Sequence, residues 1–132
     1  MLDIASTKSI SDIQRDFSLQ YPYLKLEFYL GNNSSMSPVQ RKHLQSSVPV
    51  KKVGLLRNGT IDISDLMTVG QLEKIFLIEF GLAAQVSRKS GILWLETTMT
   101  DSWTLKQQND HGRELSEPAT HINKYTDRLD ED

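Results

Sequence analysis

Two stretches of the chain carry apolar residues at the spacing of an amphipathic helix. In the stretch 9–23 they lie at positions 10, 13, 17 and 21, and in the stretch 68–82 they lie at positions 69, 72, 76 and 80. Residues at i, i+3, i+7 and i+11 share one side of an α-helix, so each stretch is predicted to be a helix with one buried face. The second stretch adds Ile75, Leu77 and Ile78, and we expect it to be the more buried of the two.

The two stretches also match each other residue by residue at a constant offset of 59 positions. Each opens with a hydroxyl residue, followed three positions later by a residue able to complete a capping box. These residues are Ser9 and Asp12 in the first stretch and Thr68 and Gln71 in the second. Strand-like alternation follows each helix, which extends the likeness to 9–30 and 68–88. Duplication and convergence of two amphipathic helices both account for it, and the sequence leaves the two open.

Alternation of apolar and polar residues with period two predicts strands after both helices. In 24–30, Leu24, Leu26, Phe28 and Leu30 are expected to face the core. After the second helix, the alternation in 82–86 and the apolar run 92–97 flank a turn-like segment at 87–91, which predicts a β-hairpin. The run 92–97 is apolar on both faces, and this predicts a central strand or one covered on both sides.

The region between these two units is less regular. Segments 50–57 and 60–63 flank Asn58-Gly59, the preferred residue pair of a type I′ turn, so a hairpin is the favoured interpretation. A short helix over 51–57 is the alternative. Further along, residues 100–102 offer caps for a third helix over 103–110 that Gly112 would end.

These elements predict an α+β protein, a small single domain with a mainly antiparallel sheet and helices on one face. Residues 1–115 are expected to form that domain. Residues 116–132 are rich in Asp and Glu, which is typical of a solvated acidic tail.

Composition narrows the class of protein further. A chain of 132 residues has room for one domain of ordinary size. The absence of cysteine removes thiol catalysis, cysteine metal sites and a disulfide scaffold. No apolar stretch approaches the length of a membrane span, and the N-terminus has no secretory signal pattern, so a cytoplasmic protein without membrane contact is expected.

The formal net charge of −2 conceals one basic segment. Between Glu27 and Asp62 there is no acidic residue, and the candidate anion- or partner-binding side chains are Arg41, Lys42, Lys51, Lys52 and Arg57. Clustered cations raise the local potential toward phosphate or an acidic partner. A solvated loop explains the same charges, and no aromatic residue lies between Tyr29 and Phe76 to stack on bases. The pattern gives nucleic-acid binding only weak support.

Sequence motifs for catalysis are lacking. Gly54 to Gly59 has the glycine spacing of a phosphate-binding loop, but Thr60 stands where that loop needs lysine. The spacings of His43, His111 and His121 match no metal site. We therefore predict no catalytic residue, no cofactor and no metal, and an enzyme of unrecognised type is only a third alternative.

Two aromatic residues are candidates for a protein interface, in which tyrosine and tryptophan are enriched. Tyr29 lies on the polar face of its predicted strand, and Trp94 lies in the run that is apolar on both faces. The pattern favours a core position for Trp94, with an interface as the alternative. The leading hypothesis is a non-catalytic interaction or adaptor module with a protein partner or a second copy, and anion or nucleic-acid binding through 41–57 is the runner-up.

Overall fold

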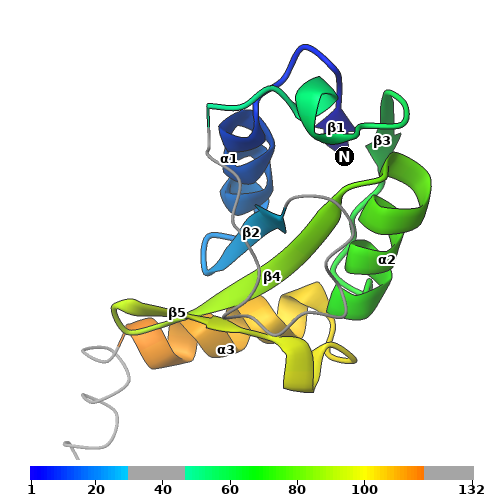
Figure 1. Cartoon of the computed structure of the whole chain (residues 1–132). Coiled ribbons are helices and arrows are strands. Elements are labelled where there is room, and N and C mark those ends of the chain that lie inside the picture. The colour runs from blue at the N-terminus through cyan, green and yellow to red at the C-terminus, as the bar shows by residue number, and fades with distance from the viewer. Residues whose placement is uncertain (30–46, 118–132) are drawn as a thin grey trace, which may run out of the picture.

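A computed structural model describes residues 1–29 and 47–117 of the chain (Figure 1). The elements in chain order are β1 (Leu2–Ile4), α1 (Ile10–Gln20), β2 (Leu24–Tyr29), the 3-10 helix η1 (Val50–Val53), β3 (Gly59–Ile61), α2 (Val69–Phe80), β4 (Ala83–Ser90), β5 (Leu93–Glu96), the 3-10 helix η2 (Thr98–Thr100) and α3 (Leu105–Ser116). This is the predicted α+β class, with helices packed against strands.

The strands form two small sheets in place of the single sheet expected. β1 pairs with β3, and the larger sheet has the order β2-β4-β5. All of these pairings are antiparallel. The longest pairing joins β2 to β4 over six residue pairs, from Leu24 opposite Arg88 to Tyr29 opposite Ala83. This pair of strands is the main part of the larger sheet.

The core lies between the larger sheet and the helices. Leu24, Leu26 and Phe28 are buried, as the alternation predicts, whereas Leu30 lies outside the described residues. Phe28 of β2 meets Phe76 of α2 edge to face, with 5.4 Å between ring centroids. Aromatic pairs in this geometry add to the stability gained from burial alone. The contact fastens the helix of one half of the chain to a strand of the other.

The α-helices pack on the face of the larger sheet that holds Leu24, Leu26 and Phe28. Arg88 stands opposite Leu24 in the register and therefore shares its face. The guanidinium of Arg88 donates to the side chain of Gln108 in α3 at 2.8 Å. Phe17 of α1 belongs to the same buried cluster as Leu24. One face of the sheet thus carries the helices, as predicted.

Each α-helix begins with a complete capping box. The hydroxyl side chain accepts from the backbone N–H three residues later, and the side chain at that position accepts from the backbone N–H of the cap. Together these bonds satisfy two of the donors left open at a helix start. The residue pairs are Ser9 with Asp12, Thr68 with Gln71, and Thr104 with Gln107. The first two confirm the sequence prediction.

The third helix differs from its predicted bounds. It is capped by Thr104 and runs through Gly112 to Ser116, so the predicted helix over 103–110 starts too early and stops too soon. Gly112 is buried, and a Cβ at this position would come within 2.9 Å of the Tyr23 Cβ and 3.1 Å of the Arg88 Cγ. Glycine here allows close packing of α3 on the sheet and does not act as a helix terminator.

The hairpin predicted around Asn58-Gly59 is wrong. Val50–Val53 forms the 3-10 helix η1, close to the helical alternative, and β3 pairs with β1. The Asn58 side chain accepts a hydrogen bond from the backbone N–H of Ser6 at 2.8 Å. The asparagine therefore secures the entry into β3 against the segment after β1, and a distant strand takes the partner position that a hairpin would fill locally.

The hairpin between β4 and β5 is confirmed, but its turn lies further along. β4 continues through Ser90, and Ser90 pairs with Leu93 across a two-residue turn at Gly91 and Ile92. Gly91 has φ +66°, a left-handed conformation that glycine adopts at little cost. The polar residues 87–90, predicted to form the turn, instead belong to β4, because they pair with Leu93–Glu96 of β5.

The internal likeness extends further in the structure than in the sequence analysis. Leu2 and Ile4 of β1 are buried on either side of an exposed residue, and at the offset of 59 positions Ile61 and Ile63 are buried in the same way. The chain thus repeats the order strand, helix, strand: β1-α1-β2 is the first unit and β3-α2-β4 the second. First strand pairs with first strand and second with second, both antiparallel.

A backbone contact at the start of each helix is repeated as well. The first helical residue donates to a carbonyl of a later segment, and that segment returns a hydrogen bond two residues before the helix start. In the first unit these bonds are Ile10 N–H to Val48 O and Val50 N–H to Lys8 O, and in the second they are Val69 N–H to Trp103 O and Leu105 N–H to Met67 O. The short helix η1 therefore stands in the first unit where α3 stands in the second.

Candidate functional site

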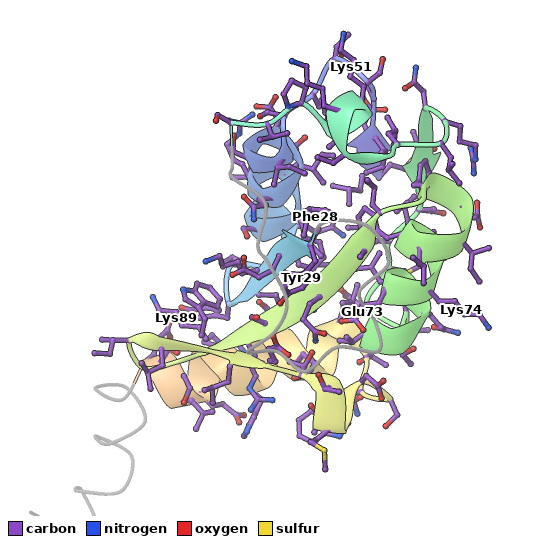
Figure 2. All side chains as sticks on the ribbon, viewed as in Figure 1. Phe28, Tyr29, Lys51, Glu73, Lys74 and Lys89 are labelled. Atoms are coloured by element: carbon purple, nitrogen blue, oxygen red, sulfur yellow. The ribbon has the colours of Figure 1, made fainter. Side chains whose placement is uncertain are left out.

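The five predicted basic residues do not form one described patch. Arg41 and Lys42 lie outside the described residues. Lys51 and Lys52 are exposed neighbours on η1, and Figure 2 shows Lys51 at the end of the molecule remote from Lys89. Within the described ranges, the basic segment thus presents two adjacent lysines, Lys51 and Lys52, to solvent without an ion pair.

Arg57 is engaged within the chain. Its Nη2 lies 2.7 Å from Glu79 Oε1 of α2, and the guanidinium stacks on Phe80 with 4.6 Å to the ring centroid. A half-exposed ion pair of this kind contributes little to stability, but it neutralises the cation locally. Because Glu79 offsets its charge, Arg57 would attract a phosphate less strongly than the sequence suggests.

Tyr29 is almost completely buried, with 4% of its surface exposed. Its hydroxyl donates to Glu96 Oε2 of β5 at 3.0 Å. The register puts Tyr29 on the same face as Lys25, opposite the face that holds Phe28, as the sequence predicts. Its present contacts make it a link between β2 and β5 and not an exposed interface residue.

Trp94 lies on an exposed edge and not in the core that its pattern favours. β5 is the outer strand of the larger sheet, which corrects the expectation of a central or doubly covered strand. We call the run Ile92, Leu93, Trp94 and Leu95 the β5 edge; all four side chains are exposed, Leu93 at 60% and Trp94 at 39%. Lys25 sits over the indole of Trp94 at 5.6 Å from the ring centroid.

A second apolar surface lies on α2. The turn before this helix and the outward side of the helix enclose a groove of about 520 Å³, which we call the α2 groove; it is lined by Ser64, Leu66, Met67, Gln71, Lys74, Ile75, Ile78 and Glu79. We expected the extra apolar residues to make α2 the more buried helix, but Ile78 is 62% exposed. Ile75 and Ile78 line this surface hollow instead.

The equivalent place in the first unit has a different chemistry. Lys8 Nζ lies 2.7 Å from Asp16 Oδ2, a partly buried ion pair. At the offset of 59 positions their counterparts are Met67 and Ile75, both in the α2 groove. The sequence alignment of the two stretches was interpreted at the buried positions only. The sequence signal for the groove is the replacement of the charged residues Lys8 and Asp16 by Met67 and Ile75.

The buried polar groups serve structural roles. Gln108 is fully buried; it accepts from Arg88 and donates to Thr100 O at 2.8 Å and to Thr100 Oγ1 at 2.7 Å. Burial lowers the pKa of Arg88 from its ordinary value. This network ties α3 to β4 and η2.

In residues 1–29 and 47–117 no three His, Cys, Asp or Glu side chains are placed to hold a metal ion. Over the same two ranges, no helix has the length and apolar character needed to cross a membrane. No family model, no curated protein and no solved structure matches this chain. Function must therefore be inferred from the two apolar surfaces themselves.

Proposed function

We propose that the protein is a non-catalytic interaction module that binds an extended segment of a partner protein along the β5 edge. The observation that carries the proposal is the outer position of β5 among the described strands, where the side chains of Leu93, Trp94 and Leu95 are exposed together with Ile92 of the turn before them. Edge strands present backbone N–H and C=O groups that pair readily with another chain, and proteins usually guard them with charge or proline. Between Gly91 and Glu96 this strand has neither.

Strand addition would use the two kinds of recognition that a sheet edge offers. Backbone hydrogen bonds supply affinity, and alternate side chains supply specificity. Leu93 and Trp94 point to opposite faces of the sheet, so a bound strand would find an apolar contact on each. Tryptophan is among the commonest residues to dominate binding energy at interfaces. We infer that the bound segment carries apolar side chains at successive positions.

Anion binding, the alternative, has less support. Arg57 already pairs with Glu79 and stacks on Phe80. Lys51 and Lys52 alone give a weak local field, because phosphate recognition usually gathers several cations and hydrogen-bond donors at one place. The β5 edge, in contrast, presents four exposed apolar side chains next to one another.

A peptide display selection against the wild-type protein tests the proposal. Selected peptides are expected to bind Leu93→Ser and Trp94→Ser at least about tenfold more weakly than wild type, as for central interface residues. Met99→Ser is the matched control, because Met99 is 95% exposed on η2, off the edge, and should bind as wild type does. Amide hydrogen exchange should slow in β5 when peptide is bound. Failure to enrich any peptide, or equal binding by all three variants, would contradict the proposal.

A further inference from the structure

The outward side of α2 has the residue pattern of a helix-pairing seam. Gln71, Ile75 and Ile78 lie at i, i+4 and i+7 and therefore share one face of the helix. Both isoleucines line the α2 groove. Leu66, from the turn before α2, lines it as well and is exposed. An apolar ridge beside an apolar hollow on the same surface is suited to a partner that presents a similar ridge.

The charges beside this ridge are complementary to each other. Lys74 and Glu79 are five residues apart, about 140° around the helix axis, so they flank the isoleucine ridge on opposite sides. Figure 2 shows Lys74 directed outward from α2, whereas Glu73 points toward the sheet, where its carboxylate accepts from the N–H of Val86 at 2.9 Å. Lys74 has no ion-pair partner within the described part of the chain.

We propose that two copies of this protein associate through α2, with the two helices parallel and related by a twofold axis that runs along them. In that arrangement Ile75 and Ile78 occupy the central positions of a short coiled-coil contact. Lys74 of each copy stands beside the partner's Glu79, since flanking residues five apart meet across a parallel helix pair. The symmetry forms this ion pair twice.

A second copy is favoured over another occupant because both members of the charge pair come from the same helix. An antiparallel pair would bring Lys74 beside its own symmetry mate and Glu79 beside its own, which is repulsive. Glu79 is half exposed while it binds Arg57, so it retains room for a second cation. The self-complementary charges therefore specify both the partner and its direction.

The first unit shows what the same helix looks like without this surface. At the offset of 59 positions, Arg15, Asp16 and Leu19 replace Lys74, Ile75 and Ile78. Asp16 would lie at a central position of an equivalent seam, and it is paired with Lys8. A buried carboxylate at the centre of a helix pair is costly, so α1 is not expected to self-associate.

Sedimentation velocity of the full chain over a range of protein concentrations tests the inference. The wild type is expected to show a concentration-dependent dimer, and Ile78→Asp should weaken dimerisation at least about tenfold. The matched control is Leu19→Asp at the equivalent position of α1, which is 74% exposed and should dimerise as wild type does. Urea unfolding of both variants checks that each remains folded, since neither side chain is buried.

A charge exchange tests the direction of the helices. Lys74→Glu and Glu79→Lys should each weaken the dimer. The double variant should recover part of the loss, because the pair between copies re-forms with its signs reversed while the Arg57–Glu79 pair within each copy stays broken. Equal dimerisation by wild type and the two single variants would overturn the parallel arrangement. A monomeric wild type would overturn the inference altogether and leave the groove to a different partner, while equal behaviour of Ile78→Asp and Leu19→Asp would place self-association elsewhere. None of these substitutions touches β5, so this inference and the proposed function stand or fall separately.

Discussion

The two repeated units share a framework and differ in the surface they present. In β1-α1-β2 and β3-α2-β4 the strands pair with their counterparts, and both helices begin with a capping box. On the outward side, the first unit closes its helix to the preceding turn with the Lys8–Asp16 ion pair. The second unit places Met67 and Ile75 there and opens a groove.

This difference separates residues that build the fold from residues that serve contacts. The buried positions of α1 and α2 keep their apolar character in both units, because a cavity left in the core lowers stability. Outward positions are free of that constraint, and the charged pair Lys8 and Asp16 of the first unit is replaced by Met67 and Ile75 in the second. After the second unit comes the full-length α3, where the first unit is followed by the short helix η1. Of the two proposed contact surfaces, the α2 groove lies in the second unit and the β5 edge lies directly after it.

The largest effect on stability is expected when the equivalent buried phenylalanines of the two helices are replaced. Phe17 and Phe76 are aligned at the offset of 59 positions, and both are fully buried. Phe17→Ala and Phe76→Ala are each expected to lower the free energy of unfolding by about 3–5 kcal/mol. Guanidinium unfolding followed by fluorescence and circular dichroism measures this. Phe→Leu at the same positions serves if the alanine variants do not fold. Two separate transitions would mean that each unit has its own core, contrary to the Phe28–Phe76 contact.

A smaller effect is expected where the units differ by one hydroxyl. Tyr21 is aligned with Phe80, and its buried hydroxyl group donates to Asp65 Oδ1 at 2.9 Å. Tyr21→Phe is expected to lower the free energy of unfolding by about 0.5–1.5 kcal/mol. Burial, assisted by the bond to Asp65, raises the pKa of Tyr21 to about 12 from 10.0. The stabilisation is therefore present below pH 10.0 and is lost as the pH rises through the folded pKa near 12.

Tyrosinate absorbance during an alkaline titration reads this step directly. The wild type should show ionisation near pH 12 that is missing from Tyr21→Phe. If both proteins complete their titration at the same pH, the hydroxyl group of Tyr21 is not the buried donor described above.

The smallest effect concerns the capping boxes, one acidic and one neutral. The hydrogen bond from the Ser9 backbone N–H lowers the pKa of Asp12 below its ordinary value of 3.8. The stabilisation is thus present above about pH 4 and is lost as the pH falls through the folded pKa. Gln71 makes the same contact in the second unit without titrating. The difference in urea stability between wild type and Asp12→Gln should narrow as the pH falls below 3.8. Gln71→Ala is the control, and it should lower the free energy of unfolding by the same amount at every pH. If the difference between wild type and Asp12→Gln does not change with pH, ionised Asp12 is not the capping group of α1.

Much of the framework could be predicted because local patterns determine it. The apolar spacing and the caps identified α1 and α2, and alternation identified β2, since these signals depend on residues a few positions apart. The pairing of β1 with β3 could not be predicted in this way. A three-residue strand has almost no pattern of its own, and its partner residues lie 55 to 59 positions away.

The candidate surfaces were only half visible in the sequence. The run around Trp94 was recognised as unusual, but an apolar strand reads as buried unless its place in the sheet is known, and edge position is a property of tertiary structure. The prediction that Gly112 ends the third helix was wrong for a related reason. Glycine after a helical stretch suggests a helix end, whereas here Tyr23 and Arg88 pack so closely that they leave no room for a Cβ. The basic segment looked stronger in sequence because Arg57 had no visible partner.

The pairing of β1 with β3 also bears on how the chain folds. It joins Leu2 to Ile61, so its formation closes a loop of roughly sixty residues, and the entropy of that closure is lost before the contact returns any energy. The β4–β5 hairpin closes across two residues, and the helices are local. We therefore expect the helices and this hairpin to form early and the β1–β3 sheet to form late. The three residues of β1 would then be the last strand to pair.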